Sequence, residues 1–254
     1  MFLARSTTRR PVARVLATAL AVFALAACGG SSPSPSPSTV TDGGTTGGPT
    51  PTPSAQGCAP GGGAVPAGAS SAPTVDLDGD GAADTLWLSA GLPRTLGVST
   101  ASGAVFSTEF SSGAPQAATA LAQRLADGTV IILLNTGRAV PLYAVIDCAI
   151  VPTKNAQGQQ YTFDLGFTGF GTGVGCADVG SGRQLVGLNA VTHDNGATYD
   201  VTRTPIDLGD RGRTATNGTP AVVGTALPAD DPAVSAARAV TCDDAPPPVT
   251  EPAG

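Results

Sequence analysis

The sequence predicts a mainly β domain: a compact antiparallel β fold that carries two short helices and is cross-linked by disulfides. Short apolar segments bounded by Gly, Pro or Asp recur between residues 85 and 206, as expected of strands joined by turns. The 254 residues include 34 Gly and 22 Pro, which is high for a compact domain and low for a wholly disordered chain. These observations together predict one folded domain and a long flexible segment.

The amino terminus is typical of an export signal. Four arginines precede a 13-residue apolar run, 15–27, which is too short to span a bilayer as a helix. The run ends in Leu25-Ala26-Ala27-Cys28, which resembles the lipobox of bacterial lipoproteins. The resemblance implies a signal peptide over 1–27, acylation of Cys28, and anchoring at the outer face of the cytoplasmic membrane or in the cell envelope. The alternative is an ordinary secretory signal that contains a cysteine.

Charge limits the partners of the exported chain. Loss of residues 1–27 removes four arginines and no acid, which leaves 9 basic and 19 acidic residues and a net charge of −10. Nucleic acid is therefore not an expected partner, because neutralising phosphates requires clustered positive charge. An anionic membrane would repel the chain, so the lipid must hold it there. One long apolar run excludes a polytopic membrane protein, and the lack of a Gly-X-Y period excludes collagen.

The segment 28–56 is predicted to be a tether. It consists almost entirely of Pro, Ser, Gly and Thr, and nothing in it could be buried. The folded domain is expected over 57–245, followed by a disordered tail over 246–254.

Four cysteines remain when Cys28 is acylated: Cys58, Cys148, Cys176 and Cys242. None of them forms a CxxC pair, so a zinc ribbon or a thioredoxin-type site is not expected. An oxidising compartment favours two disulfides, and the sequence leaves all three pairings open.

The expected strands follow from alternation or from short apolar runs. They cover 85–89, 95–100, 104–110, 130–134, 140–151, 161–167, 184–192 and 197–206. Asp194-Asn195-Gly196 predicts a hairpin turn, because Asn-Gly tolerates positive φ. A helix is expected over 115–126, where Ala and Leu form one stripe, and another after Asp231-Pro232, an N-cap followed by proline. The Gly-rich run 166–175 is expected to be a bent or bulged strand that enters Cys176.

The segment 76–84 predicts a metal site. It places carboxylates at positions 1, 3, 5 and 9, glycine at position 6 and a free carbonyl at position 7, which is the pattern that a hard cation such as Ca²⁺ requires. The expected ligands are Asp76, Asp78, Asp80, Asp84 and the carbonyl of Ala82. The loop is not an EF-hand, because position 12 is Trp87 instead of glutamate. The alternative is an acidic turn that binds no ion.

The run from Val75 to Leu88 resembles the calcium loop of FG-GAP and VCBS repeats, short β units in which the loop joins two strands. The resemblance implies a structural calcium ion held by the five expected ligands. A degenerate copy begins at Asp178 and retains only its first acid, so it would keep the turn without the metal. Two copies about 100 residues apart are too few for a propeller, and we carry over only the loop.

Two functions of different classes are compatible with these features. The first is a non-enzymatic, calcium-stabilised lipoprotein module that binds an envelope protein or glycan. The second is an envelope hydrolase that uses carboxylates or the region of His193, the single histidine. No catalytic sequence frame accompanies His193, which favours the binding module.

Overall fold

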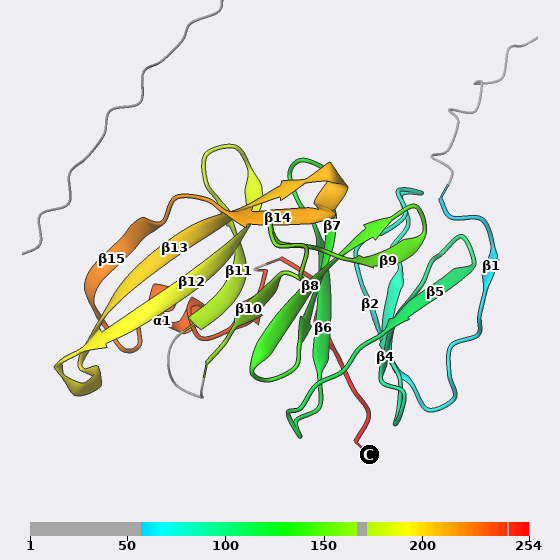
Figure 1. Cartoon of the computed structure of the whole chain (residues 1–254), viewed down its shortest axis with the longest axis horizontal. Coiled ribbons are helices and arrows are strands. Elements are labelled where there is room, and N and C mark those ends of the chain that lie inside the picture. Colours follow the sequence, from blue (N-terminus) through cyan, green and yellow to red (C-terminus); the bar gives the residue numbers. More distant parts are fainter. Residues whose placement is uncertain (1–56, 167–171, 243, 254) are drawn as a thin grey trace, which may run out of the picture. The chain divides into compact units, whose positions relative to one another are not determined.

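The computed structural model describes residues 57–166, 172–242 and 244–253, and these residues form three β-sheets and one α-helix (Figure 1). The predicted fold class, a mainly β antiparallel domain with disulfides, is confirmed. No helix among the described residues is long and apolar enough to cross a membrane. The predicted signal peptide, Cys28 and the tether lie outside the described residues.

The first sheet, here called the N-terminal sheet, has the order β1-β5-β4-β3-β2. Its strands are β1 (Gly61–Gly62), β2 (Ser70–Pro73), β3 (Thr85–Leu88), β4 (Thr95–Ser99) and β5 (Ala104–Glu109). Neighbours from β2 to β5 are antiparallel and consecutive in the chain, and β1 alone pairs in parallel, with β5.

The central sheet has the order β10-β8-β7-β6-β17, and β9 also pairs with β8. Its strands are β6 (Thr119–Arg124), β7 (Val130–Asn135), β8 (Ala139–Ile146), β9 (Ala149–Pro152), β10 (Thr162–Asp164) and β17 (Val249–Thr250).

The C-terminal sheet has the order β14-β13-β12-β11-β16, and β15 pairs with β13. Its strands are β11 (Thr172–Asp178), β12 (Arg183–His193), β13 (Thr198–Gly209), β14 (Thr214–Asn217), β15 (Ala221–Pro228) and β16 (Val240–Thr241). The helix α1 (Pro232–Ala236) precedes β16, and the short 3-10 turns η1 (Asp194–Gly196) and η2 (Asp210–Gly212) follow β12 and β13.

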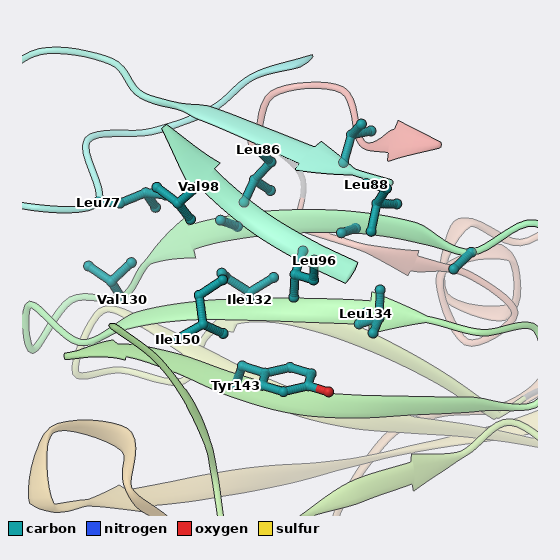
Figure 2. Close-up of a cluster of buried hydrophobic side chains, with 14 residues drawn as sticks. Leu77, Leu86, Leu88, Leu96, Val98, Val130, Ile132, Leu134, Tyr143 and Ile150 are labelled. Carbon is teal, nitrogen blue, oxygen red and sulfur yellow. The ribbon is translucent and has the colours of Figure 1, made fainter. Parts of the chain in front are cut away.

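The central sheet is apolar on both faces, which explains the unbroken apolar run of β7. Because side chains alternate along a strand, Val130, Ile132 and Leu134 face one core and Ile131 and Leu133 face the other. The first core is completed by leucines and valines of the N-terminal sheet (Figure 2). The second core is completed by residues of the C-terminal sheet, so the two outer sheets are joined through the central one.

The helix expected over 115–126 was wrong, because this segment contains strand β6. Ala120 and Ala122 pack into the first core, whereas Leu121 packs into the second. A strand between two cores is apolar on both faces, as at 120–122 of β6, and a helical stripe fits such a run equally well. Pairing with β7 on one side and β17 on the other decides in favour of the strand.

The other expected elements are mostly present. The strand expected over 140–151 is a hairpin of β8 and β9, which turns at Asp147 and Cys148, both with positive φ. The 194–196 hairpin turn joins β12 and β13, and φ is positive at all three of its residues. The helix after Asp231 is α1, whose first turn is capped by the Asp231 side chain. Strand β11 enters Cys176 from the Gly-rich run, of which 167–171 lie outside the description.

The tail expected to be disordered over 246–254 instead supplies strand β17. Val249 pairs with Ala120 and is buried in the first core. The Glu251 carboxylate accepts a 2.7 Å hydrogen bond from Arg94 Nε and another of 2.7 Å from the Ala118 amide. Arg94 also lies 4.8 Å from the Phe110 ring centroid. These contacts of the partly buried Glu251 carboxylate order a segment whose composition alone predicts disorder.

The Glu251→Gln variant is expected to lower the free energy of unfolding at pH 7 by about 2–3 kcal/mol, because it leaves the partly buried Arg94 unpaired. Burial raises the pKa of Glu251, whereas Arg94 and the Ala118 amide lower it, and the net pKa lies below its ordinary value. The stabilisation is therefore present above the unfolded-state pKa of about 4.3 and is lost as the pH falls through the folded-state pKa. Urea unfolding from pH 3 to 7 measures it. Glu109→Gln, at an exposed glutamate, should change little, and equal losses in the two variants would contradict the account.

Gly97 allows Trp87 to lie flat against the N-terminal sheet. A Cβ at position 97 would stand 1.9 Å from Trp87 Cζ2, and Trp87 is fully buried. We expect Gly97→Ala to lower the free energy of unfolding by about 3 kcal/mol, since the ring must move out of a packed site. Denaturant titration, with the tryptophan fluorescence as probe, measures this loss. Gly113→Ala, with open space around its Cβ, is the control, and equal stability of both variants would refute the close packing.

Candidate metal centre

The predicted metal loop joins β2 and β3. The loop is closed at its base, where the Thr74 amide donates a 2.8 Å hydrogen bond to the Asp84 carbonyl. Gly79 and Gly81 both have positive φ, which lets the chain double back between the acids. The glycines of the Asp-Gly-Asp-Gly pattern therefore allow the loop to fold back, so that the carboxylates at its two ends come together.

Three of the four predicted carboxylates converge. One oxygen each of Asp76, Asp78 and Asp84 lies within 4.8 Å of the others, and this group could hold a metal ion. Asp84 is buried, whereas Asp76 and Asp78 are partly exposed. A cation at this place would therefore be reached from solvent on one side and contacted by a buried carboxylate on the other.

Backbone amides hold each carboxylate of the cluster in place. Asp84 accepts from the Leu77 amide at 2.7 Å and from the Ala101 amide at 2.9 Å, one bond to each oxygen. Asp76 accepts from the amides of Gly79 and Gly81 at 2.6 and 3.1 Å. Each oxygen has two acceptor positions, so one amide bond leaves capacity for a metal ligand bond.

Asp80 is not part of this group, and its Oδ1 instead accepts a 2.7 Å hydrogen bond from the amide of the exposed Ala82. The carbonyl of Ala82 stays a predicted ligand. The converging carboxylates would therefore supply three of the six to eight oxygens that Ca²⁺ takes, and carbonyls and water would supply the others.

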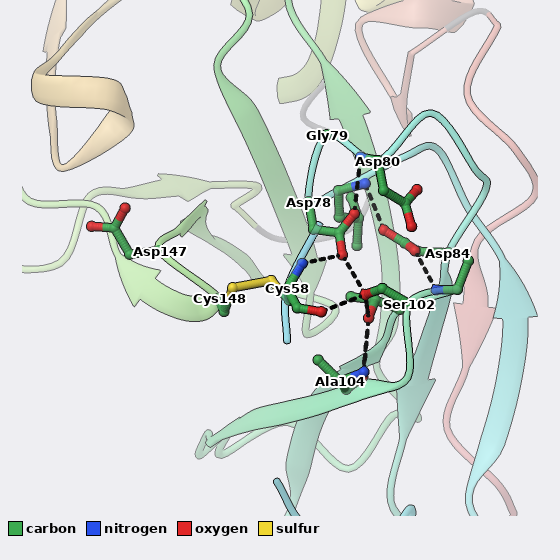
Figure 3. The surroundings of a disulfide bond; sticks show 12 residues. Cys58, Asp78, Gly79, Asp80, Asp84, Ser102, Ala104, Asp147 and Cys148 are labelled. Atoms are coloured by element: carbon green, nitrogen blue, oxygen red, sulfur yellow. Dashed lines mark hydrogen bonds between the residues drawn. A yellow bond between two sulfur atoms is a disulfide. The ribbon is translucent and has the colours of Figure 1, made fainter. Parts of the chain in front are cut away.

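Residues distant in sequence complete the site and were not predicted. The Cys58 amide donates a 2.8 Å hydrogen bond to Asp78 Oδ2, and the Ser102 hydroxyl lies 2.9 Å from the same oxygen (Figure 3). Cys58 is itself bonded to Cys148 on the β8–β9 turn. The loop is thus attached to the start of the domain and, through the disulfide, to the central sheet.

The charges of the cluster are only partly compensated by protein groups. Burial and the charges of Asp78 and Asp76 raise the pKa of Asp84, although two amide bonds lower it. The pKa of Asp78 is lowered, because its bonds from Cys58, Ser102 and Asp80 together outweigh the effect of burial. Arg124 Nη2 lies 3.5 Å from Asp76 Oδ2 and donates a 2.7 Å bond to the Asp76 carbonyl. A bound cation would offset the repulsion that disfavours ionised Asp84.

The degenerate copy at Asp178 forms a turn of similar construction. Asp178 Oδ1 accepts from the amides of Gly180 and Gly182 at 2.8 and 3.3 Å, and both glycines have positive φ. In the described part of the chain, the only group of three or more potential metal-ligating side chains is Asp76, Asp78 and Asp84. The second loop therefore keeps the turn chemistry without the carboxylate group.

His193 lies at the end of β12 with its Nε2 3.0 Å from Asp200 Oδ2. Both side chains are about half exposed. Among the described residues, no serine, threonine or cysteine side chain forms a hydrogen bond with the His193 ring. The two side chains therefore form a pair at the surface. Among the described residues, the His193 ring contacts no nucleophile that it could activate as a base.

The predicted pair of disulfides is present, and the structure selects one of the three pairings. Cys58 is bonded to Cys148 and Cys176 to Cys242.

A comparison with protein-family models found no match, and comparisons with curated proteins and with solved structures found no significant match either.

Proposed function

We propose that this chain is a lipid-anchored, extracytoplasmic protein whose β domain is stabilised by Ca²⁺ and serves as a non-enzymatic binding module of the cell envelope. The observation that carries the proposal is the convergence of the Asp76, Asp78 and Asp84 carboxylates in one loop. All-oxygen sites of this kind suit Ca²⁺, a hard cation that accepts irregular geometry. The ion would link the loop to Cys58 through Asp78, and thereby to the central sheet.

The cysteines support the extracytoplasmic part of the proposal. All four cysteines of the domain are paired, and disulfides persist in oxidising compartments. The signal-like amino terminus and Cys28 supply the expected route and anchor. Extracellular calcium modules bind with dissociation constants on the order of 0.1–1 mM, which matches a site that is partly open to solvent.

The non-enzymatic part rests on the surroundings of the titratable groups. The acidic cluster is arranged by backbone amides, and the His193–Asp200 pair is exposed and forms no hydrogen bond from its ring to a hydroxyl or thiol of the described chain. The hydrolase alternative therefore has no specific observation in its favour. An envelope protein or a glycan is the partner class we propose, and nucleic acid is not expected at a net charge of −6 for the whole chain.

Two experiments test the two parts separately. Isothermal titration of the purified full chain with Ca²⁺ should show one site, which is lost in Asp76→Asn/Asp78→Asn and retained in the Asp178→Asn control. Absence of heat in the unmodified chain would refute the calcium site. For the anchor, the chain should fractionate with membranes and Cys28→Ser should not. Membrane association of Cys28→Ser would refute lipidation at this residue.

A further inference from the structure

A small pocket lies on the face of the C-terminal sheet that points away from the central sheet. It has a volume of about 170 Å³ and is bordered by strands β11, β12, β13 and β15 and by helix α1. Most of its lining side chains are apolar: Val186, Leu188, Val201, Val223, Ala233 and Ala236. The pocket is remote in sequence from the metal loop and shares no residue with it.

The strand register explains which residues line this pocket. Gly175 on β11 is opposite Val186 on β12, and Leu188 on β12 is opposite Arg203 on β13. Since side chains alternate, these positions share one face, whereas Leu185 points into the second core on the other face. Gly175 has no side chain, and a Cβ there would lie 3.2 Å from the Thr241 carbonyl oxygen and 3.7 Å from Leu188 Cδ1. Glycine at this position therefore allows β16 to approach β11 closely at the edge of the pocket.

Arg203 is the one charged residue in this apolar lining. Its Nε is buried and has no hydrogen-bond partner among the described residues, and no acid there forms an ion pair with it. Other arginines of the domain are paired: Arg183 with Asp244, and Arg211 with Asp147. A buried donor without a partner is destabilising, more so on a charged group, and a ligand anion would offset part of that loss.

We propose that this pocket binds a small monocarboxylate, with the carboxylate at Arg203 and an apolar body against Leu188, Val223 and Ala236. The guanidinium fork matches the geometry of a carboxylate and forms charge-assisted hydrogen bonds with it. A dry apolar cavity of about 150 Å³ accommodates benzene, so a body of six or seven carbons fits this pocket. A ligand of this size binds with a dissociation constant on the order of 1 mM. The site is independent of the proposed calcium function.

The probe is 4-fluorobenzoate, observed by ¹⁹F NMR while the purified full chain is titrated in a non-ionic detergent. We expect saturable broadening of the fluorine signal and its reversal by unlabelled hexanoate. Arg203→Gln should weaken binding at least tenfold, whereas Arg183→Gln, which removes the same charge from the neighbouring strand β12, should not. Ala236→Leu places a larger side chain in the pocket and should also abolish binding. Circular dichroism of each variant controls for folding.

The neutral isostere 4-fluorobenzamide separates anion recognition from simple apolar binding. We expect it to bind at least ten times more weakly than 4-fluorobenzoate. Equal binding of the two compounds, equal affinity in Arg203→Gln, or no saturable binding of 4-fluorobenzoate to the unmodified chain would each overturn the proposal. None of these outcomes depends on calcium, so the experiment is carried out both with chelator and with Ca²⁺, and the same result is expected.

Discussion

Replacement of Asp84 by alanine is expected to lower the free energy of unfolding by about 2–4 kcal/mol, even in the presence of a chelator. The variant leaves the buried amide of Leu77 and the partly buried amide of Ala101 without their acceptor, and each lost partner costs about 1–3 kcal/mol, with the larger loss at Leu77. Relief of the repulsion from Asp78 and Asp76 offsets a part of this loss. Denaturant unfolding in chelator measures the effect without any contribution from a metal.

Asp80→Ala is the matched control. It removes a carboxylate from the same loop, but one that lies outside the converging group and bonds only to the exposed Ala82 amide. We expect a loss below about 1 kcal/mol in chelator. If Asp84→Ala were as stable as Asp80→Ala, the hydrogen bonds from Leu77 and Ala101 to Asp84 would not stabilise the loop.

Removal of the Cys58–Cys148 disulfide has the second large expected effect. The bridge closes a sequence separation of 90 residues, for which the loop-entropy relation gives an upper value of about 4.6 kcal/mol. We expect Cys58→Ser/Cys148→Ser to lose about 2–4.5 kcal/mol and also to bind Ca²⁺ several-fold more weakly, because the Cys58 amide helps to place Asp78. Urea unfolding and calcium titration measure the two effects.

The second disulfide provides the comparison. Cys176 and Cys242 are 66 residues apart, so the Cys176→Ser/Cys242→Ser variant should lose a similar amount of stability. It is distant from the metal loop, and its calcium affinity should be unchanged. Equal calcium affinities in the two double variants would contradict the link from the disulfide through Cys58 to Asp78.

Strand positions were predictable where the local sequence pattern fitted a strand and did not fit a helix. Alternation and turn residues correctly located β3, β4, β5, β7, β12 and β13, since each is bounded by Gly, Pro or Asp. Strand β6 was predicted as a helix because both of its faces are buried. Its second face is buried by the C-terminal sheet, whose first strand begins only at Thr172. Strand β17 depends equally on distant partners: Ala120 and the Arg94–Glu251 pair.

The convergence of Asp76, Asp78 and Asp84 was predictable because the three residues lie within nine positions, and the spacing of Asp and Gly brings them together. The supporting residues were not predictable. Cys58 and Ser102 reach Asp78 across 20 and 24 residues, and Ala101 reaches Asp84 across 17. The disulfide pairing was undecided for the same reason, since only the fold places the Cys148 turn beside Cys58.

Stabilisation by calcium is the central claim, and thermal unfolding of the full chain in chelator and in 10 mM Ca²⁺ tests it most directly. With a dissociation constant on the order of 0.1–1 mM, linkage predicts about 1.4–2.7 kcal/mol of stabilisation. For a domain of this size, that corresponds to a rise in Tm of roughly 3–10 °C. We expect this rise in the unmodified chain and in Asp178→Asn, and its loss in Asp76→Asn/Asp78→Asn. The same Tm with and without Ca²⁺ in the unmodified chain would contradict the account.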